Sequence, residues 1–120
     1  MQELQAYCLS KITRDLIEEH FRVSPRAKGI YKVQLRMLRH ILHCESLDYR
    51  LVIRRLNELN LMVVAYRHNG SNNTWLLVID PEEAVIGSVL EYLSALIDNK
   101  TKIVLPLFQN TRVPVIAASQ

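Results

Sequence analysis

The spacing of apolar residues first predicts an N-terminal helix. Over residues 3 to 21, apolar side chains recur at helical intervals with charged residues between them, at Leu4, Cys8, Ile12, Leu16 and Ile17. This periodicity is typical of an amphipathic helix with one buried face. The stretch RVSPRAKG ends it, because proline disfavours helical backbone at the preceding residue and glycine frees the chain.

Two further helices are predicted over residues 32 to 43 and 47 to 59, separated by the short turn HCES. Each has an apolar face at helical spacing. The first would bury Leu35, Leu38, Ile41 and Leu42. The second would bury Tyr49, Val52, Ile53, Leu56 and Leu59.

The next segment changes from helical to extended patterning. LMVVAYR and TWLLVI are rich in β-branched and aromatic residues, and HNGSNN between them contains Asn-Gly, so a hairpin is predicted. Asp80, Pro81 and Glu83 then indicate the capped start of a helix ending near residue 98. KIVLPLF and VPVIAA are candidate short strands, which Pro106 and Pro114 would confine to sheet edges.

Composition and length indicate one folded domain over residues 1 to 120, with a core at 1–80 and a C-terminal extension at 81–120. No apolar run approaches a membrane span, and the start of the chain lacks the apolar segment of a signal peptide. Two cysteines are too few for a disulfide scaffold, so we expect reduced thiols, with Cys8 acting as a small hydrophobe. The expected location is the cytoplasm of a bacterium or viral host, or the nucleus of a eukaryote.

Positive charge is concentrated in the middle of the chain. The net charge is +3, but residues 22 to 67 contain ten Lys or Arg against three acids, a net of +7. Residues 68 to 120 contain three bases and five acids, a net of −2. A basic central segment indicates an anionic partner for that part of the protein.

The spacing of apolar residues after Leu38 links this basic segment to a known protein family. Apolar residues follow Leu38 at offsets of 3, 4, 11, 15, 18, 23 and 24 residues, and the sequence then enters the hairpin. Over residues 11 to 80 this order resembles the winged helix-turn-helix family, in which two helices brace a third and a β-hairpin forms the wing. The resemblance implies an α+β fold of three helices and a wing, here with an added C-terminal helix and short strands. Asn60 replaces the usual glycine, and His43 replaces the small residue customary in the turn.

The resemblance implies that the third helix enters a DNA major groove and that the wing lies beside it. Its outward positions hold Asp48 and the candidate contact residues Arg50, Leu51, Arg54 and Arg55. Arginine pairs with guanine edges or phosphates, and a leucine can touch a thymine methyl group. The candidate wing contacts are Arg67, His68, Asn69 and Asn72. Arg26, Lys28 and Lys32, near the expected start of the second helix, are candidates for backbone contact.

The chain therefore predicts a sequence-specific double-stranded DNA-binding protein: a small homodimeric transcriptional repressor, or a plasmid or phage protein that binds operator or centromere-like repeats. One alternative is that the arginines are only a solvated helix face. Another is a winged-helix subunit that docks on protein without binding DNA, which Asp48 at the helix start and an exposed Leu51 would favour.

Catalysis and metal binding find little support in the sequence. It has no glycine-rich phosphate loop, no GxSxG motif and no carboxylate pair at a telling spacing, so we expect neither an enzyme nor a cofactor. His40, His43 and Cys44 are close enough to raise the question of a metal, but they lack the paired spacing of a structural zinc site. We therefore predict no metal.

The helix at 81–97 is more apolar than a single winged-helix core requires, and large exposed apolar stripes usually mark partners. We expect it to form a homodimer interface, because two-fold symmetry doubles the contacts of a small DNA-binding module. The expected interface residues are Val85, Ile86, Val89, Leu90, Leu93, Leu96 and Ile97. In the alternative, the helix packs back on the first helix of its own chain.

Overall fold

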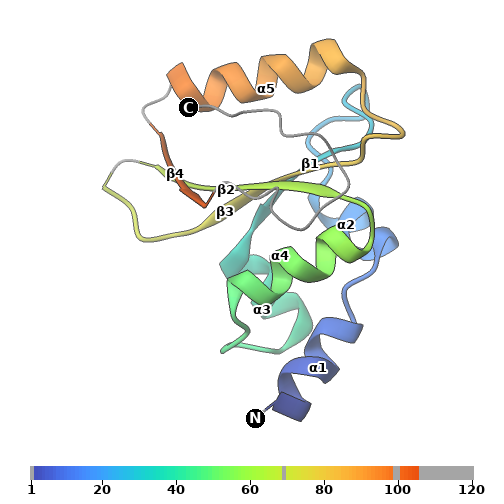
Figure 1. Ribbon diagram of the computed structural model, residues 1–120, viewed down its shortest axis with the longest axis vertical. Coiled ribbons are helices and arrows are strands. Elements are labelled where there is room, and N and C mark those ends of the chain that lie inside the picture. The colour runs from blue at the N-terminus through green and yellow to red at the C-terminus, as the bar shows by residue number, and fades with distance from the viewer. Residues whose placement is uncertain (1, 69, 99–100, 106–120) are drawn as a thin grey trace.

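The computed structural model describes residues 2–68, 70–98 and 101–105. Within them the chain forms the small α+β domain shown in Figure 1. Its helices are α1 (Gln2–Ser10), α2 (Arg14–Phe21), α3 (Leu35–Leu42), α4 (Tyr49–Glu58) and α5 (Ile86–Asp98). Its strands are β1 (Ile30–Gln34), β2 (Met62–His68), β3 (Trp75–Ile79) and β4 (Thr101–Leu105).

The strands form one antiparallel sheet in the order β1-β3-β2-β4. The predicted hairpin is confirmed as β2 and β3, which pair from Met62 opposite Ile79 to Tyr66 opposite Trp75. Among the described strands β4 lies at an edge of the sheet, the position predicted from its sequence. The second predicted C-terminal strand lies outside the described residues.

The prediction of a helix from residue 32 was wrong at its start. Residues 30 to 34 form β1, which pairs with β3, and α3 begins only at Leu35. Ile30, Tyr31 and Val33 are β-branched or aromatic residues and all are buried. Pairing with a neighbouring strand therefore overrode the local helical spacing.

The single N-terminal helix is also corrected, because the structure has two. α1 ends at Ser10 and α2 begins at Arg14, with Thr13 capping the second helix by accepting a 3.1 Å hydrogen bond from the backbone NH of Leu16. Threonine at this position satisfies a backbone donor that the helix cannot pair internally. Ile12 lies in the break between the two helices and is fully buried. The apolar spacing therefore identified a core residue correctly, although the helix is interrupted there.

Two apolar layers cover the two faces of the sheet, because successive strand residues point to opposite sides. Val63 and Ala65 of β2 pack with α1 to α4, whereas Val64 and Tyr66 pack with α5. Figure 1 shows α5 alone above the sheet and the other four helices below it. None of the described helices has both the length and the apolarity needed to cross a membrane.

The helix predicted to begin at Pro81, with Asp80 as its cap, begins later, at Ile86. Asp80 instead organises a turn: its carboxylate accepts from the NH of Glu82 at 3.0 Å and its carbonyl from those of Glu83 and Ala84. Gly29 makes this turn possible, because its φ is +79° and a Cβ there would lie 2.7 Å from the backbone nitrogen of Ala84. The turn before β1 and the turn after β3 therefore pack backbone to backbone.

α5 packs on the sheet of its own chain. Val89 and Leu96 are buried in this contact, so they belong to the core and not to the predicted dimer interface. The alternative that α5 packs on the first helix is also wrong, since the sheet separates them. Four of the seven expected interface residues remain exposed, namely Val85, Ile86, Leu90 and Ile97, while Leu93 is partly buried.

Candidate nucleic-acid interface

The turn between α3 and α4 is closed by the backbone of its first residues. His43 has a φ of 57°, in the left-handed region, and its NH donates to the carbonyl of His40. Cys44 donates to the carbonyl of Arg39 at 2.9 Å. These bonds satisfy carbonyls at the end of α3. Asn60 adopts the same conformation after α4, with a φ of 65°, as its place in the sequence predicted.

Two side chains fix the start of α4. Arg39 donates through two guanidinium nitrogens to the carbonyl of Leu47, at 2.9 and 2.7 Å, which holds α3 to the turn. Asp48 caps α4 by accepting a 2.9 Å hydrogen bond from the NH of Arg50. Asp48 therefore has a local structural role, so its presence at the helix start is not evidence for docking on protein.

The orientation of α4 leaves two arginines free on its outer side. Val52, Ile53 and Leu56 are buried, and Arg50 and Arg54 are exposed. The guanidinium of Arg50 lies 5.6 Å from the ring centroid of the neighbouring Tyr49. Ion pairs in the described parts of the chain join Arg14 to Asp80, Arg22 to Glu18 and Arg55 to Glu58. None of them uses Arg50 or Arg54, so both charges are accessible to a ligand.

Arg55 differs from the other two arginines. Its Nε donates to the carbonyl of Ile12 at 3.2 Å, and its Nη1 lies 3.6 Å from Glu58. Leu51 is half-buried, and with Arg55 it lines a groove of about 360 Å³ between α1 and α4. Arg54 lines the same groove, so three of the predicted contact residues, Leu51, Arg54 and Arg55, lie beside α1.

The hairpin tip contributes a second group of polar side chains. Arg67 donates to the hydroxyl of Thr74 at 3.2 Å, and the NH of Ser71 donates to the carbonyl of His68 at 3.0 Å. His68 and Asn72 are exposed. The imidazole of His68 packs edge-on against Trp75, with ring centroids 6.1 Å apart. Asn69 lies outside the described residues.

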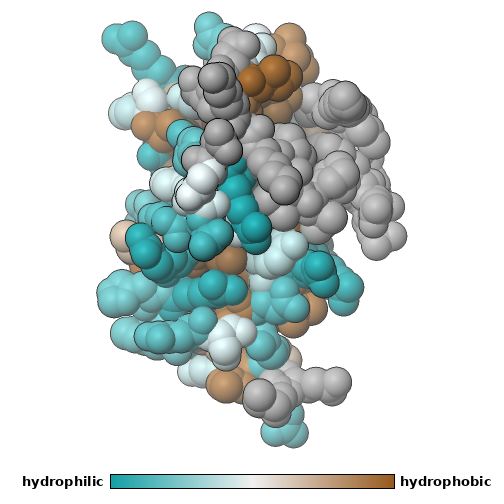
Figure 2. All heavy atoms as spheres, turned by 90° about the vertical axis from the view of Figure 1, so that its left-hand side faces the viewer, coloured by the Kyte–Doolittle hydropathy of each residue, from teal (hydrophilic) through white to brown (hydrophobic). Residues whose placement is uncertain are grey.

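The tip and the start of α4 lie on the same side of the molecule. In Figure 1 both lie toward the left, where β2 ends and α4 begins. The NH of Leu35 donates to the carbonyl of Thr74 at 3.0 Å, so the start of α3 is also tied to this end of the hairpin. Figure 2 shows this side directly, and hydrophilic side chains cover most of its middle. The tip and the first turn of α4, which carries Arg50, thus lie toward one largely hydrophilic side of the molecule.

Three predicted contact residues are not brought to this face. Arg26 and Lys28 are exposed in the turn before β1, beside Ala84, at the end of the sheet opposite the hairpin tip. Lys32 lies within β1, with its Nζ 5.8 Å above the ring of Trp75 on the α5 side of the sheet. They were grouped with the helix start because the helix was predicted to begin at residue 32, whereas residues 30 to 34 form β1.

Arg36 is a basic residue that the sequence analysis missed. It is exposed in the first turn of α3, next to Leu35, whose backbone is bonded to the hairpin end. The signal that identifies it is the apolar register of α3: Leu35, Leu38 and Leu42 are buried, so position 36 points outward. It adds a positive charge near the tip.

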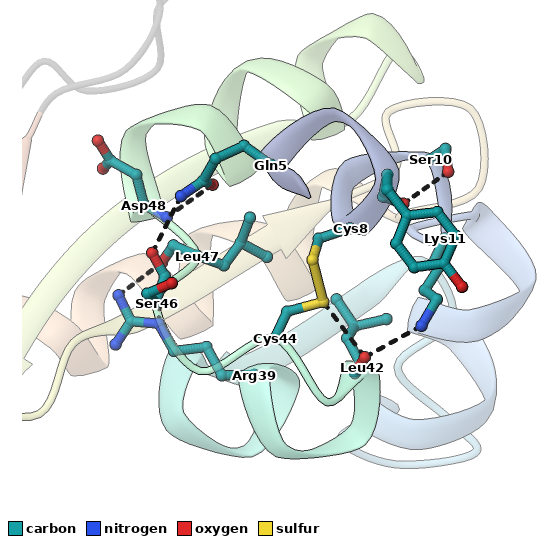
Figure 3. The surroundings of a disulfide bond; sticks show 11 residues. Gln5, Cys8, Ser10, Lys11, Arg39, Leu42, Cys44, Ser46, Leu47 and Asp48 are labelled. Atoms are coloured by element: carbon teal, nitrogen blue, oxygen red, sulfur yellow. Dashed lines mark hydrogen bonds between the residues drawn. A yellow bond between two sulfur atoms is a disulfide. The ribbon is translucent and has the colours of Figure 1, made fainter. Parts of the chain in front are cut away.

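The two cysteines form a disulfide, which corrects the expectation of free thiols. The bond joins Cys8 of α1 to Cys44 in the turn before α4, with the Cα atoms 6.2 Å apart (Figure 3). Polar contacts accompany it: Gln5 donates to the carbonyl of Ser46 at 3.1 Å, and Lys11 donates to that of Leu42 at 3.2 Å. α1 is therefore fastened to the segment that positions α4. The pair was not evident from sequence because 36 residues separate the cysteines.

The disulfide also removes Cys44 from the possible metal ligands near His40 and His43. No group of three or more His, Cys, Asp or Glu side chains within the described residues is placed to hold a metal ion.

Comparison with protein-family models, with curated proteins and with solved structures found no match.

Proposed function

We propose that this protein is a winged helix-turn-helix module that binds double-stranded DNA. The observation that carries the proposal is the pair Arg50 and Arg54 on α4: both are exposed, and neither takes part in the ion pairs of the described residues. A pair of free cations on a helix, beside a polar hairpin, complements the phosphates and groove edges of a duplex.

The order of elements supports the arrangement. From residue 14 to residue 79 the chain runs α2, β1, α3, α4, β2 and β3, and β3 lies between β1 and β2 in the sheet. α4 has 10 residues and is therefore about 15 Å long. An α-helix with its side chains is about 10–12 Å in diameter, so it fits a major groove about 12 Å wide. α2 and α3 then brace α4 from behind.

The two arginines are four residues apart and so lie one above the other on α4. Each guanidinium can pair with the O6 and N7 atoms of guanine or with a phosphate. Arg36, Arg67 and Asn72 supply contacts to the flanking backbone, whereas the ring of His68 packs on Trp75, as Lys32 does, on the α5 side of the sheet. Arg55 and Leu51 are excluded from the contact set, because Arg55 is bonded to the carbonyl of Ile12 and Leu51 is half-buried, whereas Arg54 is exposed.

The protein acts as a homodimer in this proposal, because one short helix and one hairpin tip reach only a few base pairs. A two-fold arrangement doubles the contacts on palindromic or repeated sites. The corresponding biological roles are those of a small transcriptional repressor, or of a plasmid or phage protein that binds operator or centromere-like repeats.

The test is a titration of mixed-sequence duplex DNA at several salt concentrations. We expect affinity to fall steeply with salt, by about 0.9 log units per phosphate contact for each log unit of salt. Arg50→Ala/Arg54→Ala should weaken binding and reduce that slope. The matched control is Arg26→Ala/Lys28→Ala, which removes the same charge at the far end of the sheet and should change binding much less.

Two outcomes would reject DNA binding by this face: affinity that is indifferent to salt, or equal losses for the two double variants. Selection from a randomised duplex library tests sequence specificity separately. If the protein binds no duplex DNA, the alternative of a winged-helix subunit that docks on another protein is favoured.

A further inference from the structure

The outer part of α5 has an apolar side that is exposed and that the described part of the chain does not cover. Val89 and Leu96 point into the sheet and are buried. Ile86, Leu90 and Ile97 are respectively 69%, 52% and 75% exposed. Aliphatic side chains this exposed, gathered on one helix, mark a docking surface.

The uncovered residues follow a coiled-coil spacing. Ile86, Leu90, Leu93 and Ile97 are separated by four, three and four residues, which is the alternation of a seam repeating every 3.5 residues. We refer to these four residues as the α5 seam. It runs beside the stripe that faces the sheet, and Leu93 at its edge is partly buried there. A second helix is the partner that such a seam fits.

The α5 seam is also symmetric about its own midpoint. Ile86 precedes the point between Glu91 and Tyr92 by as many residues as Ile97 follows it, and Leu90 and Leu93 are likewise equidistant from it. Reversing the helix therefore maps each seam residue onto another seam residue. An isologous interface requires this self-complementarity, and a partner of a different sequence does not.

We propose that the α5 seam pairs with the α5 seam of a second copy of this chain in antiparallel orientation. Ile86 then contacts Ile97 of the other copy, and Leu90 contacts its Leu93. Antiparallel alignment also brings opposite ends of the helix dipoles together. No acidic or basic residue lies in the seam, so the contact desolvates no charge. The proposal rests on the homodimer of the proposed function and specifies its surface and orientation.

The size of the seam determines how tight the pairing is. α5 has 13 residues and is about 20 Å long. A single pair of such helices buries less than the roughly 1,600 Å² of a standard interface, so we expect a dimer that dissociates at micromolar concentrations. Neighbouring DNA half-sites would strengthen it by holding two copies together.

Sedimentation of the full chain across the micromolar range is the first experiment. We expect wild type to shift from monomer to dimer, and Leu90→Asp to remain monomeric. Leu4→Asp is the matched control, because Leu4 is 56% exposed on α1 and lies off the seam. A wild type that stays monomeric, or equal effects of the two variants, would overturn the proposal.

Two double variants test the orientation. Ile86→Lys/Ile97→Glu places lysine opposite glutamate at both ends of an antiparallel pair, but like charges together in a parallel one. Residues 86 and 97 are about 16 Å apart along one helix, so they cannot pair within a chain. We expect this variant to dimerise and Ile86→Lys/Ile97→Lys to be monomeric. A monomeric lysine–glutamate variant beside a dimeric wild type would reject antiparallel pairing.

The outcomes for the dimer and for DNA binding are separable. Arg50→Ala/Arg54→Ala leaves α5 unchanged and should sediment as wild type. Leu90→Asp leaves α4 unchanged and should still bind a single half-site with the salt dependence of wild type, while losing cooperative binding to paired half-sites.

Discussion

The guanidinium of Arg14 lies 2.5 Å from the carboxylate of Asp80 and also donates to the carbonyl of Leu59. One side chain thus joins the start of α2, the end of α4 and the end of β3. Asp80 is buried, and its backbone is bonded to Gly29 and Ala84 in the neighbouring turns. Arg14 therefore compensates a buried charge and also fixes one end of the proposed DNA-contacting helix.

Arg14→Ala should lower the free energy of unfolding by about 1–3 kcal/mol, because it leaves a buried charged acceptor unpaired. Chemical denaturation measures the loss. Arg22→Ala is the control: it removes an exposed pair with Glu18 on α2, and should cost less than about 0.5 kcal/mol. Equal effects of the two substitutions would show that the Asp80 pair contributes no more than a surface contact.

Reduction of the Cys8–Cys44 disulfide should destabilise the fold. The bond closes a loop across 36 residues, and constraint of the unfolded chain by such a loop is worth about 3–4 kcal/mol. Cys8→Ser/Cys44→Ser should unfold at a lower temperature than the oxidised protein and show no further change with reductant. If wild type melts identically with and without reductant, the cysteines do not form this stabilising link.

Tyr66 should limit the stability of the protein at alkaline pH. Its hydroxyl is buried with no hydrogen-bond partner among the described residues, and burial raises the pKa of Tyr66 to about 12. In the unfolded chain the pKa is 10.0, so the phenolate forms there first. Stability should be unaffected below pH 10 and fall by up to about 1.4 kcal/mol per pH unit between 10 and 12.

Tyr66→Phe should remove that part of the alkaline loss. At neutral pH it should be close to neutral or stabilising, because it deletes an unsatisfied buried hydroxyl and keeps the ring that stacks with Trp75. In this variant Tyr31 should still cause a smaller loss of stability as the pH rises, because desolvation and then Glu18 raise the pKa of Tyr31 as well. Denaturation curves from pH 8 to 12 test this, and a Tyr66→Phe curve parallel to wild type would contradict it.

The elements that the sequence predicted correctly are those governed by local pattern. The α4 helix follows from the periodicity of Val52, Ile53 and Leu56, and the β2–β3 hairpin from strand-forming residues on either side of Asn-Gly. The left-handed backbone at Asn60 was predicted for the same reason, because few residues adopt it without strain.

The elements that were missed depend on partners distant in sequence. Residues 30 to 34 form a strand because β3 lies beside them, and Asp80 forms a turn because Gly29 and Arg14 contact it. The same holds for the candidate site. Arg50 and Arg54 were found from register alone, whereas the attachment of Arg55 to the carbonyl of Ile12 depends on a contact 43 residues away.

Two glycines should respond to alanine in opposite directions. At Gly29 a Cβ would lie 2.7 Å from the backbone nitrogen of Ala84, and the φ of +79° is itself unfavourable for alanine by about 1–2 kcal/mol. Gly29→Ala should therefore destabilise the protein by at least that amount.

Gly87 lies near the start of α5 with no atom close to the position of an added Cβ. Gly87→Ala should raise stability by about 0.5–1 kcal/mol, because glycine is a poor helix former. Thermal and denaturant unfolding of the two variants measure the change in stability in each case. A Gly29→Ala variant as stable as wild type would contradict the close packing of the turns at residues 29 and 84.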